Sequence, residues 1–545
     1  MVCRFALPGE VVATLVLVGQ NGRDDCRSGA PAGQCVFGEV GRARDEALAV
    51  PLTRLEHARR LWLIAFMLIG VACAAWTFAY PRLGGPDESQ HAIRAAAVVR
   101  GELLGRHDDR YGNLDLVVDV PESYGQTANV DCYWPTMDTT PTCMSPISGS
   151  SRLVSATTYE FRGPFLYYAV VGVPTLPFPS LAGIYLMRLV NALLCAALLA
   201  SALTAAVRVR SLPLLVGVFV AIAPEVLFLG GVINSNSVEA AAGICLWTAL
   251  VALLRAPEES WKALIRTAGI AAVVLVASRG LSPLFLVICI TAIGLITPRT
   301  RLRQLLARRD IHRWALVITI ATVACATWTE YVIRKYPLNV AGLGWSRALT
   351  QIPGFGRGAI GDFVIQGRLL ALRQVPLPVF VYLAWATAMI VLLGAAVRSA
   401  RRRELLVLAG LIAVSLVVPV AGAALGAGGQ YWVGRHVLAI ACGIPILTGI
   451  YATPHDARAT ANHRSLWFGV LAALVAAQVL AFGWTLHRYI VSGSATFNPL
   501  TFLFSPTWSP PLPPALLVAV FTASLTGLAI TVARYTTRAN SLPTP

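Results

Sequence analysis

The segment 86–91, shortly after the first long apolar run, contains two adjacent carboxylates, Asp87 and Glu88, followed by His91. Residues three or four apart share one face of a helix, so both carboxylates would lie near the imidazole. A carboxylate can accept a proton from a hydroxyl group, and carboxylates with a neutral imidazole suit Mn²⁺ or Mg²⁺. We therefore predict an acid–base centre at Asp87 and Glu88, or a metal site formed by Asp87, Glu88 and His91. The alternative is a helix start in which Asp87 is the N-cap and the other two side chains are solvated.

Three further polar residues interrupt apolar sequence later in the chain. Asn236 lies in an Asn-Ser-Asn-Ser turn, Arg279 in a Ser-Arg-Gly turn, and Arg435 directly after a glycine-rich turn at 428–434. Glycine allows a backbone to approach a ligand closely, and a guanidinium group matches the oxygens of a phosphate. We predict that Arg435 binds phosphate, with Arg279 as the second candidate. The alternative is a tight turn with an arginine at the lipid–water boundary.

The elements that position these residues are predicted to be membrane-spanning helices. The chain has 545 residues, of which 56% are hydrophobic and only 13% charged, whereas soluble domains carry about 25% charged residues. A spanning helix needs ~20 apolar residues, and about twelve such stretches are present. They lie at 61–80, 182–206, 212–232, 238–255, 264–278, 281–297, 314–333, 376–397, 405–424, 436–452, 466–486 and 513–533. The predicted fold class is an all-α polytopic membrane protein with a large first loop at 81–180.

The placement of the basic residues predicts which side of the membrane each loop occupies. The net charge is +17, but the arginines gather between alternate apolar stretches, as expected of cytoplasmic loops. Both termini are then cytoplasmic, the loop 81–180 is extracytoplasmic, and nucleic acid is excluded as a partner. The segment 161–178 contains three prolines and would reverse this parity as a span, so we predict an interfacial helix there. Only two lysines are present, a bias typical of GC-rich bacterial genomes, so we predict a bacterial plasma membrane.

The large loop is predicted to fold. Residues 88–104 have an amphipathic helical pattern, and 114–120 resemble a strand. Cys132 and Cys143 share this loop, and an oxidising compartment permits a disulfide between them; the alternative is two free thiols. The predicted organisation is a disordered cytoplasmic extension at 1–55, a membrane core at 56–455 and C-terminal helices at 456–545.

Several motifs, in this order, resemble a bacterial family of predicted membrane proteins of unknown function, which in turn resembles the GT-C class of polyprenyl-phosphate-sugar glycosyltransferases. The resemblance covers residues 60–455, and Asn236 stands where the family commonly has an acid. The motifs are Pro86-Asp87-Glu88 with His91, Gly163-Pro164-Phe165-Leu166-Tyr167-Tyr168, Arg188-Leu189-Val190-Asn191, Pro224 with Asn234-Ser235-Asn236, and Gly434-Arg435-His436 with Pro445.

This resemblance implies a GT-C-like fold and transfer of a sugar from a polyprenyl-phosphate donor to a cell-envelope glycan or glycolipid on the extracytoplasmic face. Asp87 would be the catalytic carboxylate and Glu88 the second. The implied substrate-binding residues are His91, Tyr167, Asn236, Arg279 and Arg435. Two alternatives stay open: a secondary transporter or lipid or glycan flippase, which would need polar groups near mid-membrane, and a non-catalytic protein of envelope assembly.

Overall fold

The computed structural model describes most of the chain in two compact units, Met1–Glu56 and His57–Pro545. In the first unit, strands β1 (Val2–Arg4) and β2 (Thr14–Val16) pair antiparallel. The extension predicted at 1–55 falls largely on residues that are not described. The described residues are 2–4, 14–16, 39–125, 132–133, 139–337, 341–361, 363–366, 372–426, 432–453, 463–492 and 498–538.

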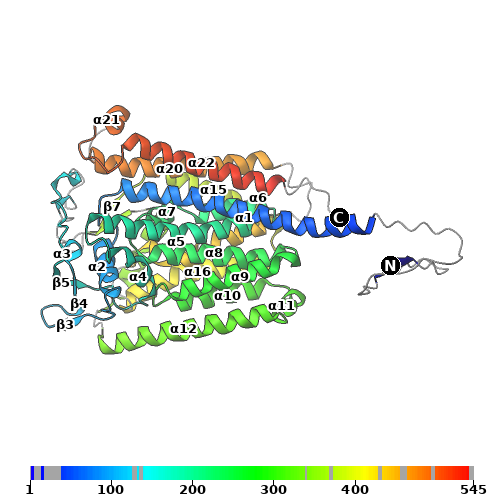
Figure 1. The fold of residues 1–545 in the computed structure, drawn as a ribbon, viewed down its shortest axis with the longest axis horizontal. Coiled ribbons are helices and arrows are strands. Elements are labelled where there is room, and N and C mark those ends of the chain that lie inside the picture. The colour runs from blue at the N-terminus through cyan, green and yellow to red at the C-terminus, as the bar shows by residue number, and fades with distance from the viewer. Residues whose placement is uncertain are drawn as a thin grey trace. The chain divides into compact units, whose positions relative to one another are not determined.

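The second unit is a bundle of long apolar helices that run side by side (Figure 1). Among the described residues, nine helices are long and apolar enough to cross a membrane, and a helix pair bent by 58° makes up to ten. The nine are the Glu56–Ala79 part of α1 (Glu39–Ala79), α5 (Leu181–Val207), α8 (Ser235–Arg255), α12 (Arg309–Lys335), α15 (Val379–Ser399), α16 (Arg402–Leu425), the run η5–α17–α18 (Gly434–Val437, Leu438–Ala441, Gly443–Tyr451), α20 (Arg464–Ile490) and α22 (Pro514–Arg538).

Three shorter segments complete the set of predicted spans. The bent pair is α6 (Leu212–Ala221) and α7 (Pro224–Gly230), and the shorter helices are α9 (Trp261–Val276) and α10 (Ser282–Ile296). The predicted apolar stretches are therefore largely helical, which confirms a mostly helical polytopic membrane protein. Helix α20 packs on α6 and α15, and α22 packs on α5 and α6, so the C-terminal helices share one core with the earlier spans.

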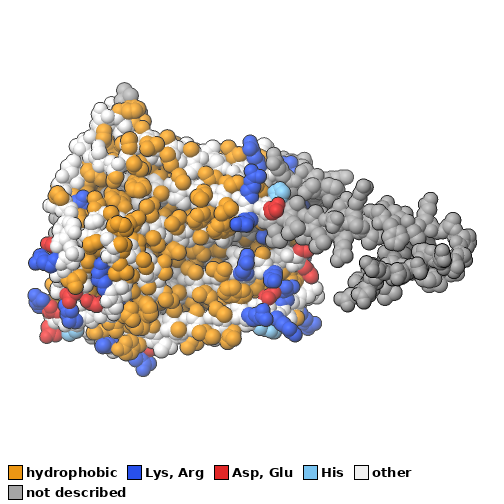
Figure 2. Space-filling model, viewed as in Figure 1, with side chains coloured by type: hydrophobic (Ala, Val, Ile, Leu, Met, Phe, Trp, Pro, Cys, Tyr) orange, Lys and Arg blue, Asp and Glu red, His pale blue; other side chains and the backbone are white. Residues whose placement is uncertain are grey.

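The surface of the second unit fits a lipid environment. Apolar side chains cover the middle of the face in Figure 2, and charged residues gather toward its two ends. On α12, Leu316, Ile320 and Val323 are each about 60% exposed. Such a continuous exposed apolar band is unfavourable in water and favourable against lipid chains.

One end of the bundle carries a small mixed subdomain, opposite the end that carries α11 (Arg299–Leu306) (Figure 1). Its antiparallel sheet has the order β3-β4-β5. The strand predicted at 114–120 is confirmed as part of β4, whereas the helix predicted at 88–104 ends earlier, before Gly101 with its φ of 91°. The elements are α2 (Glu88–Val98), β3 (Arg106–Asp108), β4 (Gly112–Pro121), α3 (Glu122–Gly125), η2 (Pro141–Cys143) and β5 (Leu153–Thr158).

The segment 161–178 does not span the bundle. It forms only α4 (Leu166–Val171) and η3 (Val173–Thr175). Tyr168 and Val171 are buried, while Val170 and Leu176 are about half exposed. A short helix with apolar side chains on its outer side agrees with the predicted interfacial position.

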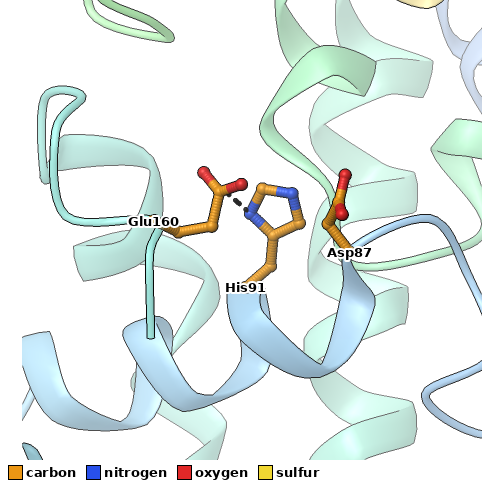
Figure 3. Close-up of side chains that lie close together, drawn as sticks. All are labelled: Asp87, His91 and Glu160. Atoms are coloured by element: carbon orange, nitrogen blue, oxygen red, sulfur yellow. Dashed lines mark ion pairs between the residues drawn. The ribbon is translucent and has the colours of Figure 1, made fainter. Parts of the chain in front are cut away.

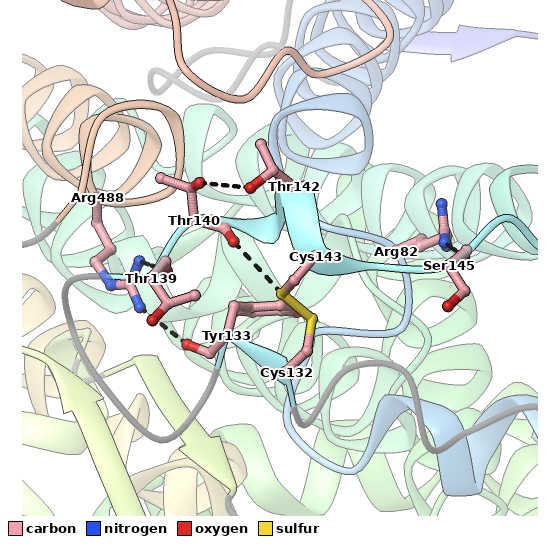
Figure 4. The surroundings of a disulfide bond; sticks show 9 residues. All are labelled: Arg82, Cys132, Tyr133, Thr139, Thr140, Thr142, Cys143, Ser145 and Arg488. Atoms are coloured by element: carbon pink, nitrogen blue, oxygen red, sulfur yellow. Dashed lines mark hydrogen bonds between the residues drawn. A yellow bond between two sulfur atoms is a disulfide. The ribbon is translucent and has the colours of Figure 1, made fainter.

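The structure joins Cys132 and Cys143 by a disulfide with an S–S distance of 2.01 Å (Figure 4). Arg488 of α20 reaches this loop and donates to the carbonyl oxygens of Thr139 at 3.0 Å and Tyr133 at 3.4 Å. The disulfide loop is thus docked on the end of α20. The remaining elements are η4 (Glu258–Ser260), α13 (Trp345–Leu349), α14 (Ile352–Ile360), the hairpin β6 (Phe363–Gln366) with β7 (Leu372–Val375), and α21 (Pro499–Phe504).

Candidate functional site

Asp87 lies at the start of α2 in a left-handed backbone conformation, with φ 56° and ψ 10°. This conformation is uncommon for a residue other than glycine. Asp87 occupies the N-cap position, as the alternative predicted, but its side chain makes no capping hydrogen bond. Glu88 and His91 are buried, whereas the alternative predicted solvated side chains. Asp87 Oδ1 accepts a hydrogen bond from the Tyr159 hydroxyl at 2.5 Å and Oδ2 one from Arg435 Nη2 at 2.8 Å. Side chains from β5's end and from η5 therefore converge on one carboxylate.

Arg435 pairs with Asp87 although the two residues are 348 positions apart in the chain. The Arg435 side chain is 3% exposed and that of Asp87 is 10% exposed. Arg435 Nε and Nη1 are buried and have no hydrogen-bond partner among the residues that the structure describes. Buried donors without a partner are rare and destabilising. These two donors are available to a ligand or to a water molecule.

His91 lies between two carboxylates, Glu160 on one side and Asp87 on the other (Figure 3). Its Nδ1 is 2.8 Å from the Tyr168 hydroxyl and 3.7 Å from Glu160 Oε2. Tyr168 also donates to Glu160 Oε2 at 3.2 Å. Burial is the main cause that lowers the pKa of His91. The negative charges of Glu160 and Asp87 raise this pKa, and the positive charges of Arg279 and Arg435 lower it. The imidazole is therefore neutral at pH 7, the form that binds metals.

Three donor atoms, one each from Asp87, His91 and Glu160, lie within 4.8 Å of one another. His91 Nε2 is buried without a partner within the described part of the chain. One imidazole and two carboxylates suit Mn²⁺, and the carboxylates alone would suit Mg²⁺. These residues can hold a divalent ion, provided that Asp87 shares its carboxylate with Arg435.

Glu88 is separate from this group, although it follows Asp87 directly. Its side chain is fully buried and forms a bidentate ion pair with Arg188, with both N–O distances at 2.6 Å. The backbone N–H groups of Gly85 and Ile233 donate to the same carboxylate. Because this carboxylate is fully buried and each of its oxygens already accepts two hydrogen bonds, the predicted roles of Glu88 as a second catalytic carboxylate and as a metal ligand do not fit this environment. Glu160 takes its place in the cluster.

Arg279 and Asn236 form a second polar contact near the cluster. Arg279 Nη1 donates to Asn236 Oδ1 and lies 3.9 Å from Glu239 Oε2. The Arg279 side chain is 31% exposed, and its charge acts on His91. Asn236 also donates to Asn234 Oδ1, and Asn234 donates to the carbonyl oxygen of Pro86 at 2.8 Å. Both predicted residues thus lie in a network that reaches the Asp87 turn.

Tyr167 lies elsewhere. Its hydroxyl donates to Asn191 Oδ1 at 3.1 Å, and Asn191 in turn binds backbone carbonyl groups between α7 and α8. This arrangement stabilises the packing of helices, whereas the next residue, Tyr168, contacts His91 and Glu160.

Tyr159, Glu160 and Tyr168 were not predicted from the sequence. Burial, and next the charge of Asp87, raises the pKa of Tyr159, so its phenol stays a hydrogen-bond donor. The signal that could have identified this set is a carboxylate and two tyrosines at the start of a proline-rich apolar segment that does not span.

Comparison with known proteins identifies the family. The chain belongs to the family described as "Predicted membrane protein (DUF2142)", which matches residues 71–441. No curated protein matches the chain. Two similar solved structures are crystal structures of ArnT from Cupriavidus metallidurans. The apo form has a TM-score of 0.41 and 14% identity, covering 88% of this chain and 78% of that one. The form bound to undecaprenyl phosphate has a TM-score of 0.37 and 14% identity, covering 87% and 77%. Likeness of this degree assigns no function.

Proposed function

We propose that this DUF2142 protein is a GT-C-like membrane glycosyltransferase. It moves a sugar from a polyprenyl-phosphate donor to a cell-envelope glycan or glycolipid on the extracytoplasmic face of a bacterial plasma membrane. The observation that carries the proposal is the contact between Asp87 and Arg435, in which a carboxylate lies beside a buried guanidinium with two unpartnered nitrogens among the described residues. The proposal of a polyprenyl-phosphate sugar as donor rests on the resemblance of the sequence motifs to GT-C glycosyltransferases.

In this proposal Asp87 is the general base. Its carboxylate takes the proton of the acceptor hydroxyl, and the acceptor oxygen forms a bond to the anomeric carbon of the sugar. The bond from that carbon to the phosphate oxygen breaks, and polyprenyl phosphate leaves with the electron pair. Tyr159 orients the Asp87 carboxylate through its hydroxyl.

Arg435 would stabilise the leaving phosphate. Its Nη2 is bound to Asp87, so Nε and Nη1 remain to donate to phosphate oxygens. Donors fixed in a site of low water content stabilise developing negative charge strongly. Arg279, which is partly exposed, would supply a second positive charge near the same group.

We further propose that Asp87, His91 and Glu160 hold Mn²⁺ or Mg²⁺ during transfer. A divalent ion would supply positive charge to phosphate oxygens. His91 contributes the unpartnered Nε2 noted above, and Tyr168 fixes its ring from the Nδ1 side at 2.8 Å. Such support of the second imidazole nitrogen is usual for metal-binding histidines.

The test is a comparison of Asp87→Asn with the wild type. Asn also tolerates the left-handed region, and its carbonyl oxygen can still accept from Arg435, so the variant should fold. We expect transfer to fall by about 10²–10⁴-fold, measured as polyprenyl-phosphate sugar consumed by the purified protein in liposomes, and as envelope glycans in a complemented deletion strain. The matched control is Asp119→Asn, because Asp119 pairs with Arg106 on the exposed sheet. Unchanged transfer in Asp87→Asn would refute the proposal.

A second candidate, a transporter or flippase, is favoured by one observation. The helix pair α6 and α7 is bent by 58° at a short break, and interrupted helices are common at transporter binding sites. Uptake or flipping of a polyprenyl-linked sugar by proteoliposomes, without any glycoside product, would support this candidate instead.

A further inference from the structure

We infer that the Glu88–Arg188 ion pair is a positioning device that holds Asp87 in its left-handed conformation. The pair thereby directs the Asp87 carboxylate toward Tyr159 and Arg435. This inference rests on the proposed function, because Asp87 is the proposed base, but it concerns residues that contact neither substrate nor ion.

Arg188 is bound on every nitrogen. It is an arginine within the apolar helix α5, where a charge is expensive unless it is paired. Its side chain is 0% exposed. Besides the two bonds to Glu88, it donates to three carbonyl oxygens at the end of α1 and just beyond, those of Thr77 at 2.9 Å, Tyr80 at 3.0 Å and Pro81 at 2.7 Å. Arg188 therefore fixes the end of α1 to the start of α2.

Glu88 is held as completely on the other side. Its Oε1 accepts from Arg188 Nε and from the N–H of Ile233, and its Oε2 accepts from Arg188 Nη2 and from the N–H of Gly85. A carboxylate bound in this way cannot rotate without leaving several buried donors unpaired. The first residue of α2 is thus fixed relative to α5 and to the turn between α7 and α8.

Asp87 is the residue between these fixed points. Its φ of 56° lies in the left-handed region, which aspartate and asparagine tolerate better than other residues with a Cβ but which still carries a steric cost that glycine lacks. On its N-terminal side, the Pro86 carbonyl oxygen is held by Asn234, and on its C-terminal side Glu88 is held by Arg188. Strained backbone persists only where its surroundings determine it. The Asp87 carbonyl oxygen accepts hydrogen bonds from the N–H groups of Gln90 at 2.9 Å and His91 at 3.0 Å. Hydrogen exchange of these two amides therefore depends on the backbone conformation of Asp87.

The competing interpretation is that the pair only joins helices. The two interpretations differ in what a glycine at position 87 should do. Glycine adopts the left-handed region without a steric penalty, so it would keep the turn without help from Glu88. Asparagine, like glycine, lacks the charge of aspartate, but it retains the Cβ. Asp87→Asn is therefore the background that is compared with Asp87→Gly.

The experiment measures hydrogen exchange of the Gln90 and His91 amides in the full-length protein in detergent micelles. Glu88→Gln should speed their exchange at least tenfold in the Asp87→Asn background and less than threefold in the Asp87→Gly background. Glu102→Gln is the control, because Glu102 is an acid that accepts from the Asp119 N–H outside the site, and it should change neither amide. Equal acceleration in both backgrounds, or none in either, would overturn the inference.

A milder variant guards against misfolding of Glu88→Gln. A Cβ at Gly85 would lie 3.0 Å from Glu88 Oε2 and 3.0 Å from Val232 Cβ, so Gly85→Ala should displace the carboxylate slightly. It should show the same dependence on the background with a smaller acceleration.

In the otherwise wild-type chain, Glu88→Gln should lower kcat by tenfold or more and leave KM within about threefold, since misplacement of a reacting group by ~1 Å can cost 10²-fold. An effect on KM alone would contradict a positioning role. If the wild type shows no transfer, the proposed function fails, and the exchange measurements still decide the positioning role.

Discussion

Arg188 and Arg435 are two buried arginines that bind adjacent carboxylates, yet their surroundings differ. Every nitrogen of Arg188 has a partner, and its pair with Glu88 is fully enclosed. Arg435 has two nitrogens without a partner among the described residues, and Asp87 keeps some exposure. Complete hydrogen bonding is what stability requires. Unused hydrogen-bonding capacity beside a carboxylate is what ligand binding requires. The difference therefore supports a structural role for Arg188 and the proposed ligand-binding role for Arg435.

The largest effect should come from Arg188→Gln. Removing one partner of a buried ion pair leaves the other charge uncompensated, and we expect a loss of about 3–5 kcal/mol in the free energy of unfolding. Thermal unfolding in detergent micelles, followed by size-exclusion chromatography, measures it. An Arg188→Gln protein as stable as the wild type would show that Arg188 has no structural role distinct from that of Arg435.

Arg435→Gln should leave the fold intact and impair transfer instead. Asp87 keeps its bond from Tyr159 and is partly exposed, so the melting temperature should change little. Loss of a donor to the leaving phosphate should lower kcat by about 10²-fold, measured with saturating donor. The exposed Arg106→Gln is the control. A large fall in stability without a specific effect on kcat would show that Arg435, like Arg188, has a structural role.

His91→Ala sharpens the comparison on the metal side. It should lower the affinity for Mn²⁺ at least ~10-fold, as changes around metal sites commonly do. Equilibrium dialysis and the Mn²⁺ resonance spectrum measure binding without any transfer assay. His107→Ala is the control, because His107 is exposed and contacts Asp109. Equal Mn²⁺ binding in both variants would exclude His91 as a ligand.

Tyr167→Phe should have the smallest effect. It removes one hydroxyl that donates to Asn191, which should cost about 1 kcal/mol of stability and leave transfer within twofold. Tyr168→Phe, one residue further on, removes the contact to His91 and is the comparison. A selective loss of transfer in Tyr167→Phe would restore its predicted role in substrate binding.

Much of the fold could be predicted because membrane spans and strands leave local patterns. The apolar stretches became helices, and the alternating segment 114–120 became part of β4 (Gly112–Pro121). The three prolines at 161–178 marked a segment that forms only short helices. These outcomes depend on hydropathy and on backbone preferences, which act over neighbouring residues.

The site was predicted less completely because its contacts are long-range. The chemistry of Asp87 and Arg435 marked both residues, but nothing in the spacing indicated that they meet. Adjacent acids looked equivalent, since only tertiary structure turns Glu88 toward Arg188. The available signal for this pairing was Arg188, an arginine within an apolar run, because a charge in that position requires a buried partner. Glu160 had no comparable signal in the sequence. It lies in the cluster because it follows β5, which ends beside α2.

The separation of Asp87 and Arg435 along the chain also sets an order of events during synthesis. A ribosome that adds 5–20 residues per second needs roughly 20–70 s to travel between the two codons. Throughout that interval the acidic turn has been made and its basic counterpart has not. Helices α1, α2 and α5 can form the Glu88–Arg188 pair early, and the segment with Ile233 and Asn234 adds its contacts to the turn later. The Asp87 turn can therefore be assembled before Arg435, which directly precedes the tenth apolar stretch, has been synthesised.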